Sequence, residues 1–293
     1  HCNDLKHTIA LIEEIAKKGA DGIKFQLFSA ERLYSRKTPV FPGERRKPYD
    51  IAKSVELNRT WLHEIKTAAE EKGADFLCSP FSIEDIDALE QLEVRVFKVA
   101  SSEINDVVFL KRIAETKRTV LLSTGMASLA DIESALETIS KHGPCEVFLL
   151  QCTALYPTIP QEVNLRAMET MRNMFGCAVG FSDHTMGIHI SLAAVALGAI
   201  IIEKHVTKNR DSEGPDHFFA LLPGEFGEMV TKAREIKAAL GSGKKIITER
   251  ELAKRHLSQR SIVTKRRILK GEILQEQDLI TKRPGYGLPP SLM

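Results

Sequence analysis

The 293-residue sequence has no hydrophobic run long enough to cross a membrane and no recognisable signal peptide. A membrane-spanning helix needs about 20 consecutive apolar residues. The first residues, HCNDLKHTIALIEEIAKKGAD, contain no initiator methionine and already show a helical pattern of apolar residues. We therefore expect a protein without a membrane segment, whose natural N-terminus lies upstream of residue 1.

The sequence also lacks the cysteine patterns of a disulfide framework or a zinc site. Its five cysteines are odd in number and show no metal-type spacing: Cys2, Cys78, Cys145, Cys152 and Cys177. Cys78 and Cys152 lie in apolar runs that resemble strands. This usage predicts reduced, buried thiols in a cytoplasmic protein.

Charge of one sign is concentrated only near the C-terminus. Residues 243–293 hold 12 Lys and Arg against 5 Asp and Glu, although the formal net charge of the whole chain is only +2. A basic tail can indicate nucleic-acid binding. This one contains a single aromatic residue, Tyr286, and so offers no platform for stacking bases. We expect no nucleic-acid partner, because an anionic small molecule explains the positive charge equally well.

Seven apolar runs alternate with helical patterns along the chain. The runs predict buried strands at residues 21–28, 74–80, 96–101, 119–124, 146–153, 178–184 and 200–207. Helix starts are marked by Asn58, Ser82 and Ser128, because these side chains can cap a first turn. Strict alternation of strand and helix predicts a parallel sheet with helices outside.

We predict a (β/α)8 TIM barrel that lacks its first strand, because the chain opens in a helix and then shows seven strand–helix units. A doubly wound open sheet is the alternative, but it would usually carry a glycine-rich phosphate turn, and none is present. The long polar stretch 29–57 predicts an active-site loop or lid. We expect the barrel at 1–240, a charged linker at 241–257 and a small, incomplete domain at 258–293.

Two histidines carry most of the functional information. His184 and His205 each close an apolar run, and the helical segment between them ends at Gly198. This strand–helix–strand unit should place both imidazoles at the carboxyl ends of adjacent strands, where α/β folds bind ligands. With Glu203 beside them, the two imidazoles predict an enzyme with a shared divalent metal. A lone histidine at a strand end would more often be structural.

Polar side chains gather at the ends of the other predicted strands. Lys24 and Gln26 share one face of their strand, because side chains alternate. Hydroxyl groups follow on later strands: Ser79, Ser101, Ser123, Thr153 and Ser182. Any one of these could simply cap a helix, but together with Lys24 they form a cradle for a phosphate or carboxylate. Lys24 could equally be a Schiff-base lysine.

The sequence resembles the sialic acid synthase family over almost its whole length. The resemblance rests on the segments KFQLF, FLCSPFS, FKVASSEI, LLSTGMAS, QCTALYPT, VNLRAM, GFSDHTMGI, AVALGA, IEKHVT and GPDHFFAL, in this order. The segments RSIVTKRRILKGEIL and KRPGYGLPP resemble the start of its C-terminal antifreeze-like (SAF) domain. Residue 1 aligns just after the family's first strand, and Met293 falls inside the SAF domain.

The resemblance implies that phosphoenolpyruvate condenses with an open-chain 2-acetamido sugar and releases phosphate, with Mn²⁺ or Mg²⁺ bound by His184 and His205. It assigns phosphoenolpyruvate to Lys24, Ser79, Ser101, Ser123 and Ser182. It assigns the sugar to Gln26, Tyr156, Asp216 and Arg283. Arg283 would reach the sugar from the partner subunit of a domain-swapped homodimer.

Ala154 stands where the family usually has a polar residue. Two other functions remain open: a Schiff-base lyase that uses Lys24, and a non-catalytic ligand-binding protein on the same scaffold.

Overall fold

The computed structural model describes residues 3–41 and 45–293. The chain divides into two compact units, His1–Leu240 and Gly241–Met293. The described part of the first unit holds a seven-stranded parallel sheet with its strands in sequence order. The strands are β1 (Gly22–Leu27), β2 (Asp75–Pro80), β3 (Val96–Val99), β4 (Thr119–Ser123), β5 (Val147–Cys152), β6 (Val179–Asp183) and β7 (Ile202–Lys204).

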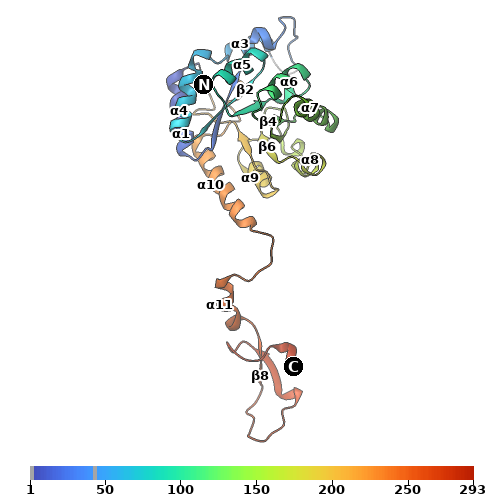
Figure 1. The fold of residues 1–293 in the computed structure, drawn as a ribbon. Helices are drawn as coiled ribbons and strands as arrows, with labels where there is room; N and C mark the ends of the chain where they lie inside the picture. Colours follow the sequence, from blue (N-terminus) through green and yellow to red (C-terminus); the bar gives the residue numbers. More distant parts are fainter. Residues whose placement is uncertain (1–2, 42–44) are drawn as a thin grey trace. The chain divides into compact units, whose positions relative to one another are not determined.

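Helices surround the outer face of this sheet (Figure 1). They are α1 (Leu5–Lys17), α4 (Leu62–Glu71), α5 (Ile83–Gln91), α6 (Val107–Glu115), α7 (Leu129–His142), α8 (Ala167–Phe175), α9 (His189–Ala196) and α10 (Pro223–Leu240). Short 3₁₀ turns lie at Arg59–Trp61, Ser101–Glu103 and Pro160–Glu162. The predicted parallel α/β architecture is confirmed.

The predicted helix starts are confirmed by their hydrogen bonds. The Ser82 hydroxyl accepts from the Asp85 backbone N–H, and Ser128 forms a reciprocal capping box with Asp131. Asn58 caps the 3₁₀ turn that leads into α4. Gly198 follows α9 with φ +88°, a left-handed conformation that favours glycine.

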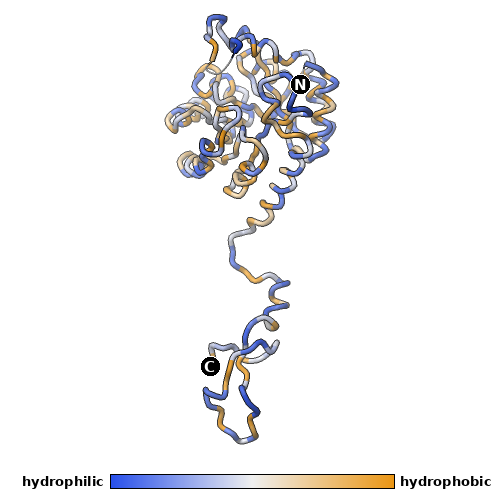
Figure 2. The backbone as a smooth tube through the Cα atoms, turned by 180° about the vertical axis from the view of Figure 1, so that it is seen from behind, coloured by the Kyte–Doolittle hydropathy of each residue, from blue (hydrophilic) through white to orange (hydrophobic). Residues whose placement is uncertain are grey.

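The hydrophobic core fills the space between the sheet and its helices. Phe97 and Phe181 on the sheet are buried, as are Ile65 on α4 and Ile86 on α5. Figure 2 shows hydrophobic and hydrophilic residues alternating along the chain of this unit. The helices therefore bury one face and expose the other.

The sheet curls, so that its first and last strands approach each other. Lys24 on β1 and Glu203 on β7 form an ion pair of 3.1 Å, although these strands are the two edges of the sheet. A doubly wound sheet would start in its middle and reverse direction. The strands here succeed one another in a single direction, so the open-sheet alternative is wrong and the first unit is an incomplete barrel.

Two segments differ from their predicted form. The last strand was expected over 200–207 but is only three residues long, because Val206 instead forms an isolated parallel bridge with Leu221. The polar stretch 29–57 contains two short helices, α2 (Ala30–Leu33) and α3 (Pro48–Ser54). These helices share a small second core with Phe28, while residues 42–44 of the stretch lie outside the described residues.

The second unit consists of a helix and a two-stranded antiparallel sheet, with 3₁₀ turns at Glu276–Asp278 and Pro290–Leu292. Its elements are α11 (Glu249–Ser258), β8 (Ser261–Thr264) and β9 (Leu279–Lys282). Helix α11 begins inside the segment 241–257 expected as a linker and ends one residue beyond it, and it starts with a capping box between Thr248 and Glu251. In the described ranges, no helix is long and apolar enough to cross a membrane.

The thiols of Cys78, Cys145, Cys152 and Cys177 are free. Cys78 and Cys152 are buried as expected, whereas the other two are half-buried. Cys2 lies outside the described residues.

Candidate active site

The two predicted histidines meet at the carboxyl ends of β6 and β7. Ser182 pairs in register with Glu203, and the histidines follow two residues later on the same face. The centroids of the two imidazole rings are 5.4 Å apart, and the ring planes are inclined by 63°. The sequence prediction that these side chains lie side by side is therefore confirmed.

Both imidazoles are held in a form that can bind a metal. The Nδ1 atom of His184 lies 2.9 Å from the Thr153 carbonyl oxygen, so it carries the proton and leaves the Nε2 lone pair free. Burial lowers the pKa of His184, and burial together with the Lys24 ammonium lowers that of His205 to about 3. Neutral imidazole is the ligand form, so two nitrogen donors are available at neutral pH.

Aromatic side chains pack around the histidine pair. The Tyr156 ring lies 4.3 Å from that of His184, and the buried Phe219 ring lies 5.2 Å from that of His205. Phe219 was not predicted as a site residue, although it follows directly on the GPDHF segment. These rings limit rotation of both imidazoles and shield them from water on one side.

Glu203 is the centre of a charged cluster beside the histidines. Its Oε1 atom accepts from Lys24 Nζ at 3.1 Å and from Ser182 Oγ at 2.8 Å, and Lys98 Nζ lies at 3.9 Å. Burial alone would raise the pKa of Glu203, but Lys24 and Lys98 outweigh it and hold the pKa well below its usual range. The carboxylate is therefore ionised at neutral pH.

Lys98 is a site residue that the sequence reasoning missed. It lies on β3 with only 3% of its side chain exposed, and it donates to Ser123 Oγ at 2.6 Å. Burial lowers the pKa of Lys98 to about 8, although Glu203 opposes the shift. The signal was present in the sequence, because Lys98 interrupts an apolar strand in the same way as Lys24.

The predicted hydroxyl groups lie at the ends of their strands but differ in their contacts. The Ser101 hydroxyl accepts from the Gly125 backbone N–H at 3.0 Å. Ser79 Oγ is buried and has no hydrogen-bond partner among the described residues. An orphaned buried hydroxyl is costly and is typical of a site that a ligand completes. Gln26 lies two residues beyond Lys24 on β1 and is exposed.

The last two predicted residues lie on different units. Asp216 Oδ2 is 3.6 Å from His205 Nδ1, and burial raises the pKa of this carboxyl. Asp216 therefore belongs to the same site as the histidines. Arg283 lies just after β9 in the second unit, where it is exposed.

The cluster suits an anion beside a divalent cation. Two lysines share one carboxylate, which leaves an unbalanced positive charge near Ser123 and Ser182. The described residues include no group of three His, Cys, Asp or Glu ligands. The two neutral imidazoles supply two nitrogen donors, one fewer than the three protein ligands of catalytic zinc sites. Nitrogen donors of this kind are compatible with a divalent metal whose other positions are filled by water or substrate.

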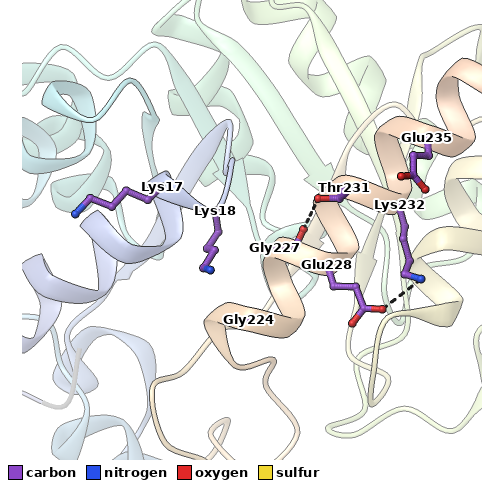
Figure 3. A pocket seen from close by; sticks show the side chains of 8 residues that line it. All are labelled: Lys17, Lys18, Gly224, Gly227, Glu228, Thr231, Lys232 and Glu235. Atoms are coloured by element: carbon purple, nitrogen blue, oxygen red, sulfur yellow. Dashed lines mark hydrogen bonds and ion pairs between the residues drawn. The ribbon is translucent and has the colours of Figure 1, made fainter.

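Two pockets differ in their distance from this cluster, and the second is lined by Cys152 and by Thr153, whose carbonyl oxygen lies 2.9 Å from His184 Nδ1. One of about 490 Å³ lies between α1 and α10 and is lined by Lys17, Lys18, Gly224, Gly227, Glu228, Thr231, Lys232 and Glu235. Figure 3 shows that its charged residues include an ion pair between Lys232 and Glu228, at 3.3 Å. The other, of about 710 Å³, lies between α7, α8 and the loops after β4 and β5. Neither contains the histidine pair.

A curled parallel sheet with charged groups and two histidines at its carboxyl edge defines a barrel-type α/β enzyme. The chain belongs to the NeuB family, whose model matches residues 11–245. It is 40% identical to the N,N′-diacetyllegionaminic acid synthase of Campylobacter jejuni, over 98% of this chain and 89% of that protein. It is 34% identical to the human N-acetylneuraminate-9-phosphate synthase, over 99% of this chain and 82% of that protein.

A solved structure supports the same assignment. The N-acetylneuraminic acid synthetase of Leptospira borgpetersenii, in complex with citrate, superimposes with a TM-score of 0.78 at 32% identity. The match covers 87% of this chain and 86% of that one. The resemblance to nonulosonic acid synthases inferred from the sequence motifs is therefore confirmed.

Proposed function

We propose that this enzyme condenses phosphoenolpyruvate with an open-chain 2-acetamido sugar to give a nonulosonic acid and inorganic phosphate. One carbon–carbon bond forms between C3 of phosphoenolpyruvate and the aldehyde carbon, and one water is consumed as phosphate leaves. The observation that carries this proposal is the Lys24–Glu203–Lys98 cluster directly beside the histidine pair. It provides an anion site and a cation site next to each other at the carboxyl edge of the sheet.

The lysines and hydroxyl groups are proposed to hold phosphoenolpyruvate. Lys24 and Lys98 supply charge for the phosphate and carboxylate, and hydroxyl groups supply hydrogen bonds. We assign these to Ser79, Ser101, Ser123 and Ser182. Ser79 is the most specific of them, because its buried hydroxyl has no partner among the described residues.

His184 and His205 are proposed to hold Mn²⁺ or Mg²⁺. When bound, such an ion supplies Lewis-acid polarisation of the sugar aldehyde. Gln26, Tyr156 and Asp216 are assigned to the sugar, since Tyr156 and Asp216 contact the two histidines. Glu203 keeps Lys24 in place through the ion pair. An ion-paired ammonium is not a nucleophile, which argues against the Schiff-base alternative.

The second unit is proposed to be the start of an SAF domain that acts across a homodimer. The proposal keeps 1–240 as a barrel without its first strand, 241–257 as connecting segment and 258–293 as SAF domain. Its exposed Arg283 would donate to the sugar's amide carbonyl in the partner's barrel. We place the enzyme in the cytoplasm, where phosphoenolpyruvate is available.

Phosphate release tests the proposal. The full chain is incubated with phosphoenolpyruvate, Mn²⁺ and each of several sugars, including N-acetylmannosamine and di-acetamido-trideoxy sugars. We expect release only when substrate, metal and one matching sugar are all present. Release without any sugar, or none with every sugar, would contradict the proposal. Borohydride trapping with a keto acid separates out a Schiff-base lyase, because only that enzyme becomes labelled at Lys24.

A further inference from the structure

Two charged residues lie directly behind the histidine pair. Asp183 precedes His184 and Lys204 precedes His205, so both point to the opposite face of their strands. Asp183 and Lys204 are direct partners in the β6–β7 register. Their side chains are 0% and 1% exposed, and Lys204 Nζ lies 2.9 Å from Asp183 Oδ2.

This ion pair also fixes the chain on both sides of His184. Asp183 Oδ1 accepts from the Thr185 backbone N–H at 2.7 Å, and Oδ2 accepts from the Ser191 hydroxyl of α9 at 2.5 Å. Lys204 Nζ donates in addition to the Thr185 carbonyl. The residues before and after His184 are thereby tied to β7 and to α9.

The Asp183–Lys204 ion pair contributes more to the position of β7 than to that of β6. Strand β7 is only three residues long, and Lys204 is its last residue. His205 lies just beyond the last β6–β7 ladder pair, so the anchored Lys204 fixes the backbone on its N-terminal side. On its C-terminal side the His205 carbonyl accepts from the Leu221 N–H, and the Thr207 N–H donates to the Leu221 carbonyl, both at 2.9 Å.

Stability alone does not account for such a pair. Taking two charges out of water is costly, and apolar residues of similar volume often give an equally stable or more stable core. An ion pair instead specifies the register of the two strands, because its hydrogen bonds are satisfied in one register only.

We propose that the Asp183–Lys204 ion pair is a positioning device, which holds the two imidazoles at the separation needed to share one divalent ion. This inference rests on the proposed metal site. Second-sphere groups that orient metal ligands typically change metal affinity about 10- to 100-fold when they are removed.

The decisive variant is Lys204→Met in the full chain. Removing a nearby cation should by itself tighten the binding of Mn²⁺, because like charges repel. The positioning role predicts the opposite, a dissociation constant for Mn²⁺ raised about 10- to 100-fold, as measured by electron paramagnetic resonance of the free ion. Binding of phosphoenolpyruvate without metal, measured by calorimetry, should stay unchanged.

Arg59→Met is the matched control. It removes the nearer cation from Asp85, another fully buried carboxylate, which accepts from the Phe81 backbone N–H at the start of α5 and lies far from the histidines in sequence. We expect this variant to lose stability and to bind Mn²⁺ like the parent chain.

The double variant Asp183→Asn/Lys204→Met separates positioning from stability. It leaves no unpaired charge, so folding stability should recover, while Mn²⁺ affinity should remain weak. Parent-like Mn²⁺ affinity in the double variant overturns the inference, and this variant decides the matter if Lys204→Met does not fold. Parent-like affinity in folded Lys204→Met overturns it as well.

The parent chain and His184→Ala show which proposal has failed. If the parent binds Mn²⁺, His184→Ala does not, and Lys204→Met binds as the parent does, only the positioning role is wrong. If the parent itself binds no Mn²⁺, the proposed metal site is wrong and the positioning role falls with it.

Discussion

Lys24 and Glu203 are 179 residues apart in the sequence, yet Lys24 Nζ lies 3.1 Å from Glu203 Oε1. This contact links the two edge strands of the curled sheet. It also places an ammonium and a carboxylate beside His205. The same pair of side chains therefore bridges the two edges of the sheet and contributes to the charge of the site.

Lys24→Met should raise the KM for phosphoenolpyruvate strongly and that for the sugar much less. Removing a charged hydrogen bond in a partly buried site costs about 2–3 kcal/mol, which corresponds to roughly 30- to 150-fold. Steady-state kinetics with each substrate varied in turn measures the effect. Lys53→Met is the control, because it removes only a surface ion pair with Glu56. An effect confined to the sugar would mean that the substrates are placed the wrong way round.

The pH dependence of phosphoenolpyruvate capture should report Lys98. With its pKa lowered to about 8 by burial, Lys98 is a charged ammonium below this pH and a neutral amine above it. An anion binds the charged form, so kcat/KM for phosphoenolpyruvate should be level below about pH 8 and fall about tenfold per unit above it. Lys98→Met should be less active at pH 7 and show no inflection near pH 8. An identical inflection in this variant would assign the titration to another group.

Arg283→Ala in the full-length protein should bind phosphoenolpyruvate and metal normally but fail at the sugar step. Mixing it with His184→Ala should restore part of the activity, because a swapped hybrid contains one barrel with an intact histidine pair and an intact donated arginine. The measurement is phosphate release before and after subunit exchange. If exchange is demonstrated and the mixture stays inactive, Arg283 does not act across the dimer.

Ser128→Ala should lower the free energy of unfolding by about 1 kcal/mol, because it removes the capping box of α7. Urea unfolding followed by circular dichroism measures this loss. Ser140→Ala is the matched control on the same helix, since its hydroxyl only donates back to the Glu137 carbonyl. Equal losses of unfolding free energy in the two variants would show that the capping box stabilises α7 no more than an ordinary surface hydroxyl group does.

The sequence was most informative where local rules act. Hydrophobic runs predicted the seven strands of the parallel sheet, cap residues such as Ser82 predicted helix starts, and strand alternation placed His184 beside His205. Each of these depends on residues close together in the chain. Lys24 and Lys98 both interrupt apolar strands, but only Lys24 was predicted to be a site residue.

Long-range relationships were beyond such rules. No local pattern joins Lys24 to Glu203, since the contact exists only after the sheet has curled. The shortness of β7 depends on the pairing of Val206 with Leu221, which an apolar run cannot reveal. The buried partnership of Asp183 and Lys204 likewise required the register of two strands.

The orphaned hydroxyl of Ser79 has an energetic consequence for ligand binding. Folding removes this group from water without giving it a partner among the described residues, at a cost of about 1–3 kcal/mol. A ligand oxygen that reached it would recover that cost as affinity. Ser79→Ala would then make the empty protein more stable and the complex weaker, so that part of the chain's folding stability is exchanged for recognition.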